Sequence, residues 1–263
     1  MTDASRPGSD PLTALRHSHE RLVDMVEPLG EDDVTRQSYD DDWSIAQVLS
    51  HLGSGAEIFG RYLAAFAAGG EPPTGEQFQP IWDTWNAKSA PEQARDALQV
   101  DGEFVATVDA LKRDGQDGWQ VEMFGMQTGL DDVVRMRLNE HAVHSWDIAV
   151  ALDPSATIAP ESVALLVDQL GQLAAWAGKP TSEPLDVVVR TESPARVFRI
   201  SSTSEGVRVE PIEDPGASAP ASLELPAEAF IRLVYGRLDA DHTPALKADG
   251  IDLDTLRSMF PGM

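Results

Sequence analysis

Hydrophobic residues recur every three or four positions along most of the first 180 residues, which is the period of an amphipathic helix. Asp10 followed by Pro11 is a typical helix start, because aspartate caps the first turn and proline fits its first position. Ser44 with Gln47 three residues later has the spacing of a capping box that opens a second helix. Similar signals indicate further helices. The predicted helices span residues 11–26, 45–69, 90–113, 128–152 and 160–177.

The chain changes character near residue 180, where β-branched residues and alternating polarity replace the helical period. The predicted strands span residues 185–190, 195–202, 206–211 and 222–225, and short helices are predicted at 226–235 and 253–260. The fold class is therefore predicted to be α+β, with two domains. Residues 1–180 are expected to form an antiparallel bundle of four main helices, and residues 181–263 a small α+β module.

Acidic residues far outnumber basic ones, with 44 Asp and Glu against 20 Lys and Arg and a formal net charge of −24. Such a charge repels phosphate backbones, which argues against nucleic-acid partners. No apolar stretch reaches the roughly 18 residues of a membrane-spanning helix, and the first residues lack the pattern of a secretory signal. The protein is therefore expected to act in the cytoplasm, without nucleic-acid or membrane partners.

The chain contains no cysteine. This excludes disulfide bonds, a catalytic thiol and metal sites that are built on thiolate ligands. Any thiol chemistry must therefore use a thiol that arrives with a small molecule.

Three side chains predict a divalent-metal site in the helical domain. Glu140 and His144 are four residues apart on a predicted helix, so they lie one turn apart on one face. His51 lies within another helix between apolar neighbours, and its side chain is able to point inward. Two histidines and one glutamate are a common Zn²⁺ ligand set that leaves a position open for water or substrate. Zinc is the predicted ion, and another divalent metal also fits.

The same residues also have simpler interpretations. A histidine in an apolar helix, such as His51, is often a hydrogen-bonded core residue, and Glu140 with His144 has the spacing of an ordinary ion pair. His141 competes with Glu140 for the role of ligand, because His141 and His144 are also near neighbours on the helix. Spacing alone leaves these alternatives open.

Two motifs in the helical domain resemble those of a known family. Residues 42–52, DWSIAQVLSHL, are similar to a metal-binding stretch of the DinB-like family, and most similar to its mycothiol-dependent maleylpyruvate isomerase branch. Residues 139–147, NEHAVHSWD, resemble a second helix of that branch. The resemblance implies that His51, Glu140 and His144 bind zinc in a four-helix bundle of the up-down-down-up type.

The C-terminal module resembles the same family. Residues 225–237, LPAEAFIRLVYGR, and the closing FPG at 260–262 are similar to its sterol-carrier-like C-terminal domain. The resemblance places Arg237 facing the metal pocket, as a catalytic residue for an anionic substrate, because guanidinium binds carboxylate bidentately. A surface arginine favoured by the dipole at a helix end is the alternative interpretation.

The resemblance implies a zinc-dependent enzyme with mycothiol as its thiol cosubstrate. In a maleylpyruvate isomerase the thiolate adds to a cis double bond, the bond rotates, and elimination gives the trans isomer. A thiol S-transferase in detoxification or natural-product biosynthesis instead leaves the thiol on a small electrophile. A metal-dependent hydrolase and a non-catalytic small-ligand carrier are further alternatives. The sequence does not choose the physiological substrate, the thiol, or between monomer and homodimer.

Other residues near these motifs have predicted roles. Asp147, three residues after His144, is predicted to orient a ligand histidine. Trp43 and Trp146 are interpreted as core residues. Three arginines are weaker candidates for the lining of the cleft: Arg61, Arg135 and Arg137. The last two straddle one helix, so at most one of them is expected to face inward.

Overall fold

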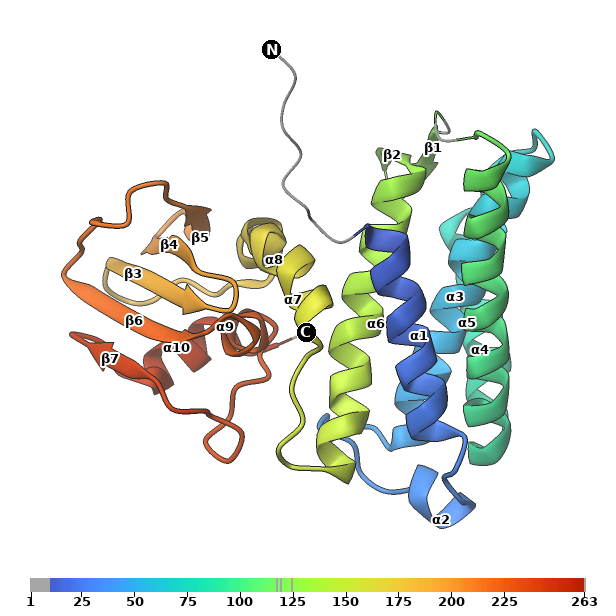
Figure 1. Ribbon diagram of the computed structural model, residues 1–263, viewed down its shortest axis with the longest axis horizontal. Helices are drawn as coiled ribbons and strands as arrows, with labels where there is room; N and C mark the ends of the chain where they lie inside the picture. The colour runs from blue at the N-terminus through green and yellow to red at the C-terminus, as the bar shows by residue number, and fades with distance from the viewer. Residues whose placement is uncertain (1–9, 117, 119, 124, 263) are drawn as a thin grey trace. The chain divides into compact units, whose positions relative to one another are not determined.

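Figure 1 shows the computed structural model of the chain, which describes residues 10–116, 118, 120–123 and 125–262. The chain divides between Ala156 and Thr157 into a helical unit and a C-terminal unit. The helical unit consists of α-helices with one short hairpin, and the C-terminal unit combines helices with a five-stranded sheet. This confirms the predicted α+β fold class.

Four long helices form the bundle of the helical unit. They are α1 (Pro11–Val26), α3 (Ile45–Ala67), α5 (Ala90–Arg113) and α6 (Leu130–Leu152). Lys112 at the end of α5 pairs with Asp10 before α1 and with Asp131 at the start of α6, so α1 and α6 both run antiparallel to α5. After α3 the chain crosses back to the end of the bundle where α3 began, and α5 starts there. Helices α3 and α5 therefore run in the same direction (Figure 1). The order is the predicted up-down-down-up type.

The predicted capping residues begin three of these helices. The Asp10 side chain caps α1, and Ser44 and Gln47 exchange reciprocal hydrogen bonds of 3.3 and 2.8 Å at the start of α3. Ser89 and Glu92 form the corresponding capping box of α5. Each box satisfies backbone N–H groups that the first turn of a helix leaves without partners.

Helix α6 begins later than predicted, because the residues before it belong to a hairpin. The strands are β1 (Gln120–Met123) and β2 (Met126–Gly129), and Gln120 pairs with Gly129. The sequence predicts a helix start at Thr128, but this residue lies within β2. Gly129 is the cap instead, and its N–H donates to Asp132 Oδ2 at 3.4 Å.

Three short helical segments were not predicted from the sequence. They are α2 (Glu31–Val34), the 3₁₀ turn η1 (Gly75–Gln77) and α4 (Phe78–Asn86). The first turn of α4 falls in the Pro/Gly-rich segment 71–80, whose composition indicates a connection. Phe78, Ile81 and Trp85 are nevertheless buried at helical spacing, so packing against α3 stabilises this helix.

We expect Gly53→Ala in α3 to destabilise the helical unit by about 1–3 kcal/mol, because α4 leaves no room for a methyl group. A Cβ at Gly53 would lie 2.3 Å from the Trp85 ring. Trp85 is only 1% exposed, and its Nε1 donates to Glu57 Oε2 at 2.9 Å, so the ring is held in place. Gly60→Ala in the same helix meets nothing within 4 Å and serves as the control. Urea unfolding measures the loss of stability in each variant. An equal decrease in the free energy of unfolding of Gly53→Ala and Gly60→Ala would contradict this explanation.

The C-terminal unit is built on one mixed sheet (Figure 1). Its strands are β3 (Leu185–Glu192), β4 (Arg196–Thr203), β5 (Gly206–Pro211), β6 (Ala221–Pro226) and β7 (Lys247–Asp249), in the order β5-β4-β3-β6-β7. Its helices are α7 (Pro160–Leu166), the 3₁₀ turn η2 (Val167–Gln169), α8 (Leu170–Ala177), α9 (Ala227–Val234) and α10 (Leu253–Met259). Only β3 and β6 pair in parallel. Phe198 on β4 and Phe230 on α9 are both buried, with ring centroids 5.2 Å apart, so α9 covers the sheet.

The C-terminal unit begins earlier than the predicted boundary near residue 180. Helix α8 packs against β5, and α7 and α8 both contact α9, so these helices associate with the sheet. A Cβ at Gly171 in α8 would lie 2.7 Å from the Val209 carbonyl oxygen, which shows how closely helix and strand approach. The change in composition at 180 therefore marks the first strand of the sheet. The domain limits 1–180 and 181–263 stay a prediction, and the packing of α7 and α8 favours the earlier division.

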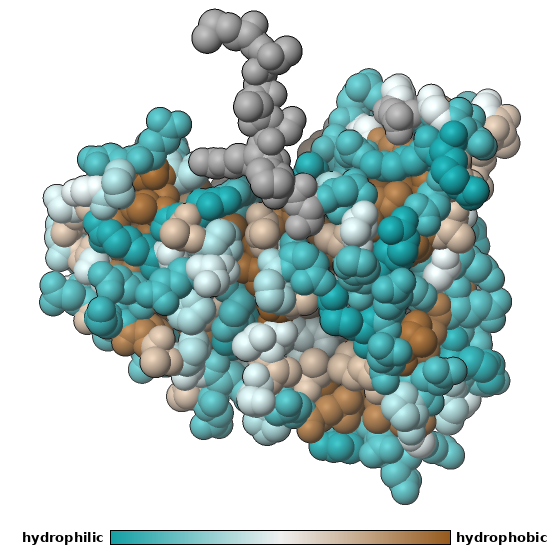
Figure 2. Space-filling view, viewed as in Figure 1, coloured by the Kyte–Doolittle hydropathy of each residue, from teal (hydrophilic) through white to brown (hydrophobic). Residues whose placement is uncertain are grey.

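Hydrophilic side chains cover most of the face that Figure 2 shows, with only small apolar areas between them. This agrees with the excess of acidic residues in the sequence. Within the described part of the chain, every helix is too short or too polar to cross a bilayer.

Candidate metal centre

Helices α3 and α6 bring the three predicted ligands together. His51 lies in the second turn of α3, and Glu140 and His144 lie one turn apart on α6. The Nε2 atom of His51 is 3.0 Å from Oε2 of Glu140, and Nε2 of His144 is 3.7 Å from the same oxygen. One potential ligand atom of each residue lies within 4.8 Å of the other two.

This donor set fits a divalent metal ion such as zinc. With bonds of roughly 2.0–2.2 Å, the ligands of a tetrahedral zinc ion lie about 3.3–3.6 Å apart, so only small shifts are needed here. The side chains of His51 and Glu140 are 36% and 39% exposed, so the group is open to solvent on one side. A fourth ligand from solution is therefore able to reach the same point.

Asp147 holds the ring of His144 from behind. Its Oδ2 is 2.9 Å from Nδ1 of His144, and the aspartate side chain is fully buried. A proton on Nδ1 then leaves Nε2 of His144 free of hydrogen on the side of Glu140, the tautomer that metal binding needs. The role of Asp147 in orienting a ligand histidine stays a prediction, and the 2.9 Å distance to His144 supports it.

The two tryptophans of the motifs have different surroundings. Trp146 is 2% exposed and lies in the core, as interpreted from the sequence. Trp43 is only partly buried, and its ring centroid is 5.2 Å from that of His51 and 6.3 Å from that of His144. Trp43 therefore forms a wall of the candidate centre rather than part of the core.

The electrostatics of the group favour the protonation states that a metal requires. Burial alone would raise the pKa of Glu140, but the hydrogen bond from His51 and the charges of His144 and His51 lower this pKa to about 2. Burial lowers the pKa of His144, and the hydrogen bond to Asp147 opposes this only in part. Glu140 is therefore ionised and His144 neutral near pH 7, as ligands must be.

We expect the metal-free protein to lose stability as the pH falls below the ordinary histidine pKa of 6.5. The pKa values of buried His141 and His144 are lowered, mainly by desolvation, so the unfolded chain takes up protons first. Because the unfolded state then binds more protons, the free energy of unfolding decreases towards lower pH. Urea unfolding with a chelator at about pH 8 and about pH 5.5 measures this. Equal midpoints would contradict the expectation.

His141, the predicted competitor, faces away from this group and into the core. Its Nε2 is 2.9 Å from Oδ2 of Asp101 on α5, and Nδ1 of His19 on α1 is 2.8 Å from the same oxygen. Arg137 donates to the other oxygen, Oδ1, from Nη2 at 2.6 Å. We call His19, Asp101, Arg137 and His141 the Asp101 network.

The Asp101 network has the donor types of a second metal site but not its environment. His19, Asp101 and His141 also bring one potential ligand atom each within 4.8 Å of the others. However, Arg137 already neutralises Asp101, and Ser18 Oγ lies 2.8 Å from Nδ1 of His141. Asp101 and His141 are 1% and 0% exposed, which leaves no open ligand position. The network is therefore a hydrogen-bonded core element.

The three candidate arginines of the helical unit lie in different places. Arg61 is exposed and forms an ion pair of 2.7 Å with Glu57. Arg137 is 1% exposed and faces inward, whereas Arg135 is partly exposed. This agrees with the expectation that at most one of the two faces inward. Sequence reasoning missed the partner of Arg137, because Asp101 lies 36 positions away on another helix.

Arg237 lies in the C-terminal unit, just after α9. It is 9% exposed, and its Nη1 donates to the Tyr235 carbonyl at 2.9 Å. Buried Arg232 forms two hydrogen bonds of 2.8 and 2.9 Å with Glu228 and donates to the Arg237 carbonyl at 3.4 Å. The backbone that carries Arg237 is therefore held in place from within its own unit. Its predicted position facing the metal pocket stays a prediction.

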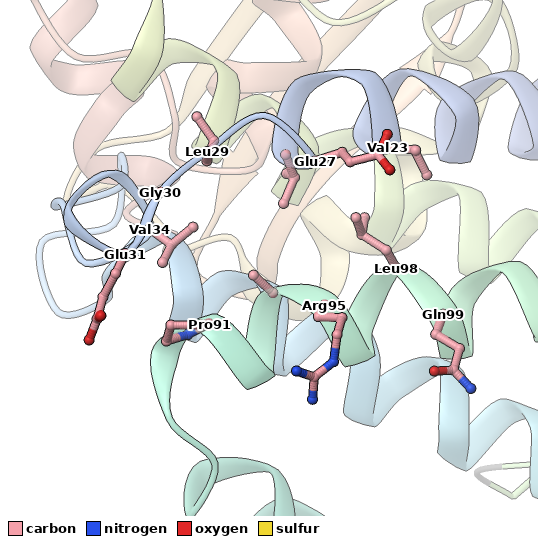
Figure 3. A pocket seen from close by; sticks show the side chains of 12 residues that line it. Val23, Glu27, Leu29, Gly30, Glu31, Val34, Pro91, Arg95, Leu98 and Gln99 are labelled. Carbon is pink, nitrogen blue, oxygen red and sulfur yellow. The ribbon is translucent and has the colours of Figure 1, made fainter.

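A separate hollow lies where α1, α2 and α5 meet (Figure 3). Aliphatic side chains such as Val23, Leu29 and Leu98 line it, and Glu31 and Arg95 add charged groups. None of the three candidate ligands lines this hollow, and none of its lining residues belongs to the two groups of potential ligands among the described residues. The candidate centre between α3 and α6 therefore carries the functional argument.

Comparison with known proteins shows the family and the fold of this chain. The family model described as "Mycothiol maleylpyruvate isomerase N-terminal domain" matches residues 15–149, which include all three candidate ligands. The crystal structure of a mycothiol-dependent maleylpyruvate isomerase is similar in fold, with a TM-score of 0.64 and 15% identity over 94% of this chain and 95% of that chain. A mutant of a mycothiol-dependent maleylpyruvate isomerase gives a TM-score of 0.62 and 15% identity over 90% and 92% of the two chains. No curated protein sequence matches. Because the family model covers more than half of the sequence, this chain belongs to the mycothiol maleylpyruvate isomerase family.

Proposed function

We propose that this protein is a metal-dependent enzyme that activates a small-molecule thiol, of the mycothiol-dependent maleylpyruvate cis–trans isomerase type. His51, Glu140 and His144 are its metal ligands, and zinc is the proposed ion. The observation that carries the proposal is the convergence of these three donors, within 4.8 Å of one another, on the partly exposed side of α3 and α6. Membership of the family supports mycothiol as the thiol.

The chemistry follows from the donor set and from the composition of the chain. A bound divalent cation stabilises a thiolate relative to its thiol, and the thiolate is the nucleophile. The chain has no cysteine of its own, so the sulfur must come from a small molecule. Glu140 and the two histidines would hold the ion, and Asp147 lies 2.9 Å from the ring of His144 and fixes its orientation. Trp43 provides an apolar wall beside both histidines.

Arg237 is the proposed binding group for a substrate carboxylate. A guanidinium is always charged near neutral pH and binds carboxylate in a fixed bidentate geometry. The buried Arg232 and Glu228 pair supports the proposal, because it holds the backbone at Arg237 in place. Replacement of Arg237 should therefore raise the KM for an anionic substrate and leave metal content unchanged.

A hydrolytic reaction is less well supported by the same site. It would need a general base beside the metal to activate water. Asp147 is the candidate that the sequence offers, but it is fully buried and lies in hydrogen-bond distance of His144. It therefore serves the ring of a ligand rather than a water molecule in the open position.

The deciding experiment incubates the zinc-loaded protein with mycothiol and maleylpyruvate and follows the loss of the substrate's absorbance. Isomerisation that requires both metal and mycothiol is the expected result. Parallel reactions with glutathione and without thiol test the choice of thiol. Conjugation of a generic electrophile without isomerisation would replace the isomerase proposal with a thiol S-transferase. Hydrolysis of an ester or amide without any thiol would overturn the thiol proposal.

A further inference from the structure

Arg137 of the Asp101 network links three helices beside the candidate metal centre. On α5 it contacts Asp101 Oδ1, with Nη2 at 2.6 Å and Nε at 3.2 Å. The same Nη2 donates to the backbone carbonyl of Leu52 on α3 at 2.8 Å. Arg137 itself belongs to α6, so its guanidinium fixes α6 to α3 and α5 at one point.

This point lies next to the ligands on both helices. Leu52 directly follows His51 in the chain, and Arg137 precedes Glu140 by one helical turn. The hydrogen bond from Arg137 to the Leu52 carbonyl is buried. The same guanidinium forms an ion pair with Asp101, and both of these side chains are only 1% exposed. A register shift between α3 and α6 would therefore have to break this bond before it could separate His51 from Glu140.

The local sequence of α3 leaves room for the link. Gly55 faces Arg137, and a Cβ built at Gly55 would lie 3.2 Å from the Arg137 Nη1 atom. A methyl group there would push the guanidinium by a few tenths of an ångström. Glycine within a helix is otherwise unfavourable relative to alanine. Its presence at position 55 is thus explained by the space that the guanidinium occupies.

We propose that Arg137, held by Asp101, is a positioning residue for the metal centre, which sets the register of α3 against α6 and so the distance from His51 to Glu140 and His144. The inference rests on the proposed metal site. Functional side chains must be held within about 0.5 Å of their working geometry, and a link one residue from His51 is well placed to do so. Nothing in this role requires Arg137 or Asp101 to contact metal, thiol or substrate.

The first test is Gly55→Ala, which separates positioning from stability. Alanine favours the helix, which opposes the cost of moving the guanidinium, so the variant should lose less stability in urea than Gly53→Ala, whose added methyl group would lie 2.3 Å from Trp85. It should nevertheless bind Co²⁺, used as a spectroscopic probe for zinc, about tenfold more weakly and with a changed visible absorption spectrum. Gly60→Ala, which meets nothing within 4 Å, is the matched control and should bind Co²⁺ like the parent.

The second test is Asp101→Asn/Arg137→Met, which removes both buried charges at once. Removing both charges avoids the uncompensated charge of a single substitution. The proposal predicts weakened Co²⁺ binding even so, because the link to Leu52 is lost. Leu111→Ala, a buried substitution ten residues beyond Asp101 on α5, controls for general destabilisation and should keep the parent spectrum.

The outcomes distinguish this inference from the proposed function. Parent-like Co²⁺ affinity and spectra in Gly55→Ala and in the double variant would overturn the positioning role and leave the metal site intact. A parent protein that binds no stoichiometric Co²⁺ would instead overturn the metal site, and the inference with it. The expected result is weakened Co²⁺ binding in Gly55→Ala and in the double variant, with parent-like binding in Gly60→Ala and Leu111→Ala.

Discussion

His51→Ala is expected to abolish stoichiometric metal binding and to raise the Kd for Zn²⁺ by more than about 100-fold. Loss of a residue that merely orients a ligand typically weakens metal binding by about 10–100-fold, so loss of a ligand should exceed this range. His51 is the one member of the group that α3 supplies, and Glu140 and His144 alone leave the ion with two protein ligands from one helix. The proposed thiol-dependent activity should disappear with the metal.

Metal content after dialysis and zinc titration measure this effect. His17→Ala is the matched control, because His17 is an exposed residue of α1. Each of the two variants then lacks one histidine. The metal-free His51→Ala protein should unfold in urea close to the parent, since the side chain is 36% exposed. One equivalent of tightly bound zinc in His51→Ala would exclude the proposed ligand set.

Arg137→Met is expected to lower the free energy of unfolding of the metal-free protein by about 3–5 kcal/mol, the largest stability effect of the substitutions considered. The reason is the charge that remains: Asp101 is 1% exposed, and removing one partner of a buried pair leaves the other uncompensated. Arg135→Met, two residues away and partly exposed, should change stability by no more than about 0.5 kcal/mol. Urea unfolding with a chelator at about pH 8 compares the two.

The destabilisation by Arg137→Met should be smaller at low pH. In the parent, burial lowers the pKa of His141, and the Arg137 charge contributes to this shift. Without Arg137, the Asp101 carboxylate favours a proton on His141, so the folded variant binds a proton that the parent does not. The difference in stability between variant and parent should therefore shrink from pH 8 towards about pH 5.5. A constant or growing difference would show that charge compensation is not the cause.

The parts of the fold that depend on neighbouring residues were predictable. Ser44 with Gln47 and Ser89 with Glu92 begin helices through hydrogen bonds within one turn, so three or four letters contain the signal. Helix α4 was missed for the opposite reason. It has only nine residues, it includes a proline, and its stability comes from packing on α3, which no local pattern reports.

The same distinction applies to the candidate site. Glu140 and His144 were recognisable because one helical turn brings them together, and His51 because its motif resembles that of a family. The inward direction of Arg137 and His141 was not recognisable. Their partner Asp101 is 36 and 40 positions away, and charged residues on a helix are usually solvated. Pairing between distant helices is a property of the packed bundle, not of any single segment.

The separation of the ligands along the chain has a consequence for assembly. His51 and Glu140 are 89 positions apart, and the crossover with α4 and all of α5 lies between them. Neither ligand helix offers the full donor set, so no fragment that ends before α6 contains the site. During synthesis the proposed ion could therefore not act as an early template for α3. Uptake of the proposed metal would instead mark the completion of the bundle, when α6 has docked against α3.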